Sequence, residues 1–106
     1  MKDILIFTAA AFFEIFGCFA FWKYFRLDHS LYWLLPGLFS LLMFAFLLTK
    51  VGVEFAGRAY AIYGGIYIAA SLCWLYFAEQ QVPDLWDVIG AGVCIVGACI
   101  ILFMPR

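Results

Sequence analysis

Four long apolar runs fill almost the whole of this 106-residue chain, at roughly residues 4–22, 31–49, 59–78 and 85–104. A helix needs about 20 residues to cross a hydrocarbon core about 30 Å thick, so each run has the length of one membrane crossing. The chain is 69% hydrophobic and only 12% charged, whereas a soluble domain is about half apolar and a quarter charged. The sequence therefore predicts an all-α, multi-pass membrane protein, folded as a single domain of four transmembrane helices.

The segments between the runs are short, which leaves no soluble domain to carry a separate activity. The runs also lack the alternating polar face that strands of membrane barrels need. The sequence contains no Gly-rich phosphate loop, no Ser/His pair and no second acid deep in an apolar run, so we expect no enzymatic activity. A net charge of −1 provides no basic face for nucleic acid.

All four cysteines lie inside apolar runs, and none belongs to a C-x-x-C pair. They are Cys18, Cys73, Cys94 and Cys99. This spacing argues against a zinc site and against a disulfide framework. We interpret the thiols as small, polarisable packing residues and expect neither a structural metal nor a cofactor.

Glu14 is the only carboxylate deep inside an apolar run. An acid at that depth costs about 2.5–3.5 kcal/mol on insertion scales and is a functional-site hypothesis by default. Its neighbours one helical turn away, Ala10, Ala11, Gly17 and Cys18, are all small, so another helix or a ligand can approach the carboxylate. The structural alternative is a buried ion pair, but no Lys or Arg lies at comparable depth in the other three runs.

The third run carries a stripe of aromatic and hydroxyl side chains at helical spacing: Tyr60, Tyr63, Tyr67, Ser71 and Trp74. Tyr and Trp rings present a negative face, so such a stripe opposite an acid suits a weakly hydrated cation. Ordinary aromatic packing, with hydroxyl groups bonded across helices, is the alternative interpretation. We predict that these residues line a substrate pocket, together with Cys18 and the acid.

Glycines and other small residues mark two more features. Gly64 and Gly65 interrupt the aromatic stripe, and a glycine pair commonly marks a helix kink, so we predict a hinge there. The last run contains a seam of small residues at Gly90, Cys94, Gly97 and Ala98. Such seams drive close packing of membrane helices. We predict that this seam holds a dimer together, with packing against another helix of the same chain as the alternative.

The ends of two runs carry local signals. Asp84, followed three residues later by Asp87, predicts a capping box at the start of the last helix. Pro36 either kinks the second helix or lies in its first turn. We interpret the second run, which carries Ser40 on one face, as a helix that encloses the site without contributing functional residues.

The balance of Lys and Arg across the membrane favours both termini in the cytoplasm. That side would hold Lys2, Lys50, Arg58 and Arg106, and the other side Lys23 and Arg26. The excess is small, and it falls further if Arg58 lies inside the third helix. A chain so nearly balanced can insert in both orientations.

These segments resemble the YnfA family. The resemblance rests on residues 14–18, on the run 57–67, on Trp86-Asp87 with Gly90-Ala91, and on the closing Pro105-Arg106. It covers essentially the whole chain, and the third-helix segment is specific.

The YnfA family is similar in architecture to the small multidrug resistance (EmrE-like) transporters. That similarity implies a four-helix protomer in the bacterial inner membrane that works as a homodimer, often antiparallel, and exports cations in exchange for protons. The acid of the first helix, which binds cation and proton alternately in those transporters, corresponds to Glu14. Their third-helix tryptophan corresponds to Trp74, their hinge to Gly64-Gly65, and their dimer seam to Gly90 and Gly97.

Two departures bear on the substrate. Phe13 precedes the acid where typical drug exporters have alanine, and those exporters lack the dense tyrosine stripe. A tighter pocket disfavours large drugs, so a small, weakly hydrated monovalent cation, including soft metal ions that suit Cys18, is an alternative to quaternary ammonium compounds. A passive ion channel and an assembly subunit of a larger complex are the rival functions.

Overall fold

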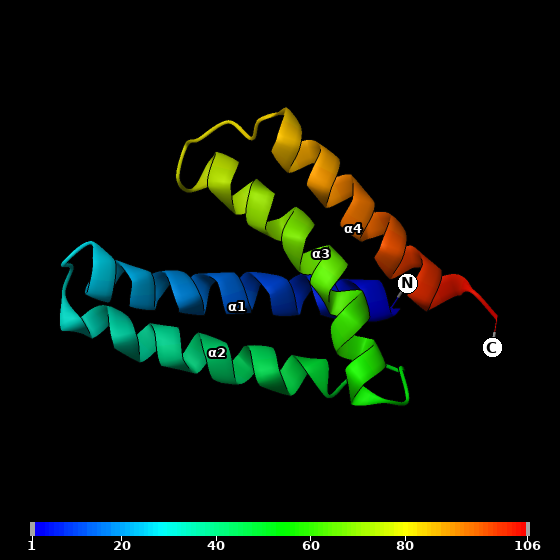
Figure 1. Cartoon of the computed structure of the whole chain (residues 1–106). Coiled ribbons are helices and arrows are strands. Elements are labelled where there is room, and N and C mark those ends of the chain that lie inside the picture. The colour runs from blue at the N-terminus through cyan, green and yellow to red at the C-terminus, as the bar shows by residue number, and fades with distance from the viewer. Residues whose placement is uncertain (1, 106) are drawn as a thin grey trace. The chain divides into compact units, whose positions relative to one another are not determined.

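The computed structural model describes residues 2–105, and these residues form helices joined by short turns. Figure 1 shows α1 (Lys2–Arg26), α2 (Leu34–Leu48), α3 (Ala56–Phe77) and α4 (Leu85–Phe103), and a 3-10 helix η1 (Leu31–Trp33) precedes α2. Taking η1 and α2 as one span, four helices are long and apolar enough to cross a membrane. The all-helical prediction with four spans is confirmed, while Arg106, used above for orientation, lies outside the described residues.

The helices differ from the predicted runs mainly at their polar ends. α1 continues to Arg26, four residues beyond the apolar run, because Lys23 and Arg26 suit the negative end of a helix. α2 begins at Leu34, so Pro36 lies in its first turn and replaces an N–H that needs no helical partner. α3 begins at Ala56 and therefore includes Arg58.

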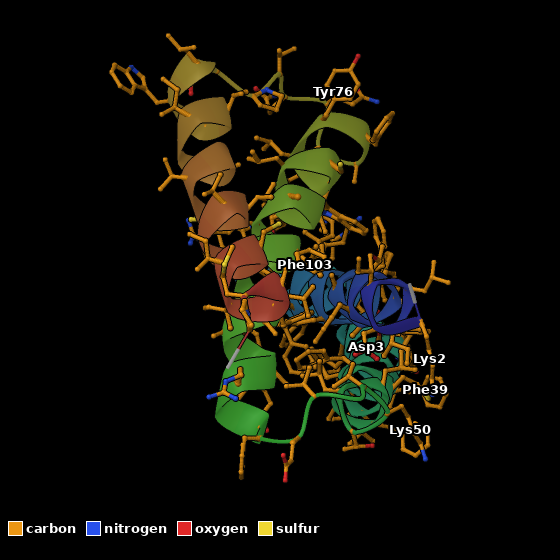
Figure 2. The ribbon with its side chains drawn as sticks, turned by 90° about the vertical axis from the view of Figure 1, so that its right-hand side faces the viewer. Lys2, Asp3, Phe39, Lys50, Tyr76 and Phe103 are labelled. Atoms are coloured by element: carbon orange, nitrogen blue, oxygen red, sulfur yellow. The ribbon has the colours of Figure 1, made fainter. Side chains whose placement is uncertain are left out.

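The described residues divide into two compact units between Val51 and Gly52. In the first unit, α1 and α2 lie side by side and run in opposite directions (Figure 1). Figure 2 looks along these helices from the end where α1 begins, and it labels Lys2 on α1 and Lys50 just beyond α2. Each unit is thus a helical hairpin with its own packing, and the single domain stays a prediction.

Both hairpins end their first helix in the same way. Asp28 and Gln80 have φ angles of 55° and 58°, in the left-handed region that ends a helix. The following N–H groups donate back to the helix, His29 to the Lys23 carbonyl and Gln81 to the Leu75 carbonyl, each at 3.0 Å. These bonds satisfy carbonyl groups that have no partner within the helix.

Aromatic rings fix the turn of the first hairpin. The Lys23 ammonium lies 4.5 Å from the centre of the Trp33 ring, which belongs to η1. The Arg26 guanidinium lies 4.5 Å from the centre of the Trp22 ring. These cation–π contacts hold two basic side chains against tryptophan rings, a residue type that is enriched at membrane–water interfaces.

The second unit pairs α3 with α4 (Figure 1). Tyr76 marks the end of α3 at which the chain turns back, and Phe103 marks the far end of α4 (Figure 2). The predicted capping box is confirmed: the Asp87 N–H donates to the Asp84 carboxylate at 2.9 Å, and the Asp84 N–H donates to the Asp87 carboxylate at 3.0 Å. Local sequence chemistry therefore sets the start of α4.

Candidate functional site

Glu14 lies in the middle of α1 and is half-buried. The small residues one turn before it, Ala10 and Ala11, are fully buried. One turn after it, Gly17 is buried and Cys18 is exposed. The small residues expected around the acid therefore differ in role: three are buried, and Cys18 remains accessible.

Helix α2 approaches α1 closely beside this acid. A Cβ atom added at Gly17 would lie 2.9 Å from the Gly37 carbonyl oxygen and 2.7 Å from Leu41 Cγ. A Cβ atom added at Gly37 would lie 2.8 Å from the Ala20 Cβ. Only glycine fits this approach with the helices at their present spacing, so Gly17 and Gly37 determine how near α2 comes to the turn that carries Glu14.

Ser40 adds a polar contact at the same level. Its hydroxyl donates to the Phe13 carbonyl oxygen at 2.6 Å, and Ser40 is only 3% exposed. The second helix was expected to contribute no functional residue, and the sequence did not predict this contact. Gly37 and Ser40, small residues three positions apart in a helix of large side chains, were the available signal.

The aromatic stripe lies on α3, in the second unit. Tyr63 is 7% exposed and contacts Tyr67, with ring centres 5.8 Å apart. Ser71 and Trp74 are half-buried, whereas Tyr60 is 58% exposed. The residues of the stripe therefore differ in exposure: Tyr60 is open to the surroundings, and Tyr63 lies in the protein interior.

The predicted hinge contains two glycines in different environments, although α3 is helical through both. A Cβ atom added at Gly65 would lie 2.5 Å from the Ala98 Cβ and 3.1 Å from the Cys94 carbonyl oxygen. A Cβ atom added at Gly64 would meet nothing within 4 Å. Packing against α4 thus explains Gly65, and the hinge remains a prediction for which Gly64 is the better candidate.

The same contact divides the predicted dimer seam. The Ala98 side chain and the Cys94 backbone lie against Gly65 of the same chain, which was the alternative stated for this seam. The Cys94 thiol itself is exposed. Gly90 and Gly97 face open space, with nothing within 4 Å of a Cβ atom added at either position. Of the four predicted seam residues, Gly90 and Gly97 therefore remain as the candidates for contact with a second chain.

No group of three or more His, Cys, Asp or Glu side chains within residues 2–105 is arranged to hold a metal ion. The Cys18 thiol lies one helical turn from Glu14 on α1.

Comparison with known proteins identifies the family. A family model described as "Uncharacterised BCR, YnfA/UPF0060 family" matches residues 1–106. The chain belongs to the YnfA/UPF0060 family. The match covers both units and every candidate site residue, and it confirms the family resemblance predicted above.

Relatives within the YnfA/UPF0060 family are named as membrane proteins. A UPF0060 membrane protein of Brucella anthropi is 58% identical over 101 residues, which is 95% of each chain. One from Ectopseudomonas mendocina is 57% identical over 106 residues, covering all of this chain and 96% of the relative. One from Cytophaga hutchinsonii is 54% identical over the full length of both chains. No solved structure matches the chain.

Proposed function

We propose that this YnfA/UPF0060 protein is a proton-coupled exporter of a cationic substrate, with Glu14 as the group that binds cation and proton in turn. The observation that carries the proposal is the position of this acid. The other acidic residues within the four helices, Asp3 and Asp87, lie in first turns, whereas Glu14 lies halfway along a membrane-spanning helix. A carboxyl group so far from either helix end has a cost that binding of a cation or proton would explain.

The chemistry rests on competition for one carboxyl group. A cation that arrives at the carboxylate stabilises its charged form and so favours release of the proton. One group then cannot hold both at once. Exchange across the membrane follows if the site opens to alternate sides, and Gly64 and Gly65 are the proposed hinge.

The remaining parts of the site are assigned on the same basis. Tyr63, Tyr67, Ser71 and Trp74 would orient the cation, with Tyr60 at the more open end of the stripe. The proposed assembly is a homodimer in the inner membrane. Gly90 and Gly97 would form the dimer contact, in a parallel or an antiparallel arrangement.

A second class of substrate is favoured by one observation. Cys18 is exposed one turn from Glu14, so a thiol and a carboxylate are both accessible on this part of α1. Thiols are soft ligands, which suits large, weakly hydrated monovalent metal ions. Such ions and quaternary ammonium compounds are therefore the two candidate classes of substrate.

A current screen on solid-supported membranes tests the function. Proteoliposomes would receive pulses of many cations, with a proton gradient imposed or absent. We expect cation-dependent currents with the natural protein and a loss of at least about tenfold with Glu14→Gln, because an amide cannot release a proton. Glu54→Gln, at an exposed loop position, is the matched control and should retain the currents.

The rival functions predict other results. A passive channel would conduct without driving protons the other way, and an assembly subunit would show no current with any cation. Undiminished, proton-linked currents in the Glu14→Gln variant would mean that another group couples the ions.

A further inference from the structure

We infer that Ser40 is a positioning residue for Glu14, acting through the backbone of α1. The inference rests on the proposed function and deepens it by adding a second residue, from a different helix, to the machinery around the acid. The carrying observation is the 2.6 Å hydrogen bond from the Ser40 hydroxyl to the Phe13 carbonyl oxygen.

The bonded carbonyl belongs to a particular peptide group. The Phe13 carbonyl and the Glu14 N–H are the two ends of one planar peptide unit. The orientation of that plane helps to set the direction of the Cα–Cβ bond of Glu14. A hydrogen bond to this carbonyl from another helix therefore restrains the rotation of α1 about its axis at the acid itself.

The bond is additional to the helical hydrogen bonding. In an α-helix the Phe13 carbonyl already accepts the N–H of Gly17, four residues on. A carbonyl oxygen has two lone pairs and can accept both donors. Ser40 therefore does not satisfy an orphaned group, and its removal should leave the helix itself intact.

A second contact restrains the same turn of α1 from the other side of Glu14. Gly17 lies against the Gly37 carbonyl and Leu41, and these residues flank Ser40 in α2. Residues 13–17 of α1 are thus held by residues 37–41 of α2, with Ser40 97% removed from solvent between them. Packing of the glycines fixes the distance between the helices, whereas the hydroxyl fixes their rotational register, because only the hydrogen bond has a preferred direction.

The test compares Ser40→Ala with Ser40→Thr and Thr49→Ala. The alanine variant removes the donor, the threonine variant keeps it, and Thr49→Ala removes another hydroxyl of the same hairpin. The Thr49 hydroxyl also donates to a carbonyl oxygen at 2.6 Å, that of Phe46, but within its own helix end. Thr49→Ala therefore controls for the loss of a hydroxyl without touching the turn that carries Glu14.

In the current assay we expect Ser40→Ala to raise the half-saturating cation concentration about threefold to tenfold, the factor that one lost hydrogen bond typically produces. The maximal current per purified dimer should change less than about twofold. Thr49→Ala should resemble the natural protein. Ser40→Thr keeps the donor but adds a methyl group at a buried position, and its half-saturating concentration should stay below that of Ser40→Ala. A purely structural serine would instead lower the number of active transporters at an unchanged half-saturating concentration, and that result would overturn the inference.

A second measurement does not depend on transport. Dicyclohexylcarbodiimide modifies protonated carboxyl groups in apolar surroundings, and mass spectrometry of the full chain reports its reaction at Glu14. We expect the rate of modification to change at least about threefold in Ser40→Ala and to stay unchanged in Thr49→Ala. Equal rates in all variants would overturn the inference. If Ser40→Ala does not fold, Ser40→Cys, which keeps the shape with a weaker donor, replaces it in both assays.

The two proposals fail in different ways. If Glu14→Gln transports normally, or if no cation gives a current, the exporter proposal is wrong, and the carbodiimide rates still decide the role of Ser40. If Glu14→Gln is inactive while Ser40→Ala matches the natural protein in both assays, only the role of Ser40 is wrong.

Discussion

At the scale of single residues, the surroundings of Glu14 show how one acid is built into an apolar helix. The buried neighbours Ala10 and Ala11 bring no bulk to the carboxylate, and Gly17 admits the backbone of α2. Cys18, one turn after the acid, is exposed. Each of these positions was predicted from its spacing to Glu14, but the spacing did not determine which one would be covered.

Gly17→Ala should destabilise the first hairpin by about 1–3 kcal/mol, as overpacking typically does. The added methyl group would lie 2.9 Å from the Gly37 carbonyl oxygen, and a backbone atom cannot rotate away as a side chain can. Unfolding of the purified protein in detergent by added SDS measures this loss. Gly92→Ala, which meets nothing within 4 Å, is the control, and equal stability of the two variants would contradict the assigned contact.

At the scale of helices, α3 and α4 show that two adjacent glycines can have separate roles. Gly65 permits the contact with Cys94 and Ala98, and Gly64 faces open space. A glycine without a packing reason weakens a helix by about 1 kcal/mol relative to alanine. Its presence at position 64 is therefore consistent with a need for flexibility.

The adjacent variants Gly64→Ala and Gly65→Ala should separate packing from motion. Gly65→Ala should lower stability by about 1–3 kcal/mol through its clash with Ala98. Gly64→Ala should raise stability by up to about 1 kcal/mol and yet slow transport if the hinge is there. SDS unfolding and the cation current measure the two effects, and a Gly64→Ala variant with full activity would remove the hinge from this position.

At the scale of the whole molecule, the outer surface of α4 is the clearest candidate for assembly. Its large side chains are mostly open, with Val93 68%, Val96 60% and Ile100 53% exposed. Gly90 and Gly97 lie seven residues apart and so share a face, whereas Gly92 lies on the opposite side of the helix. Lipid can cover such a surface, but small residues on one face favour another helix.

Gly97→Leu should therefore disrupt the proposed dimer and leave the protomer folded, because its side chain would enter space that is open within the chain. Gly92→Leu is the matched control on the opposite face and should remain dimeric. Chemical cross-linking in native membranes, with light scattering of the purified protein, reports the oligomeric state. A dimer that survives Gly97→Leu would place the interface elsewhere.

Properties that depend on local composition could be predicted from the amino-acid sequence alone. The four spans follow from apolar length, the capping box at Asp84 follows from two acids three residues apart, and the isolation of Glu14 follows from the absence of other acids at that depth. Family membership also followed from the residues alone.

Which helix contacts which small residue could not be predicted from the sequence and follows from the three-dimensional fold. Periodicity defines a face of a helix but does not name the partner that covers it. The contacts of Gly17 with α2 and of Gly65 with α4 are therefore visible only in the folded protein. The same holds for the hydrogen bond from the Ser40 hydroxyl to the carbonyl group next to Glu14. Contacts of this kind depend on the separation and rotation of two helices, which no single run of residues contains.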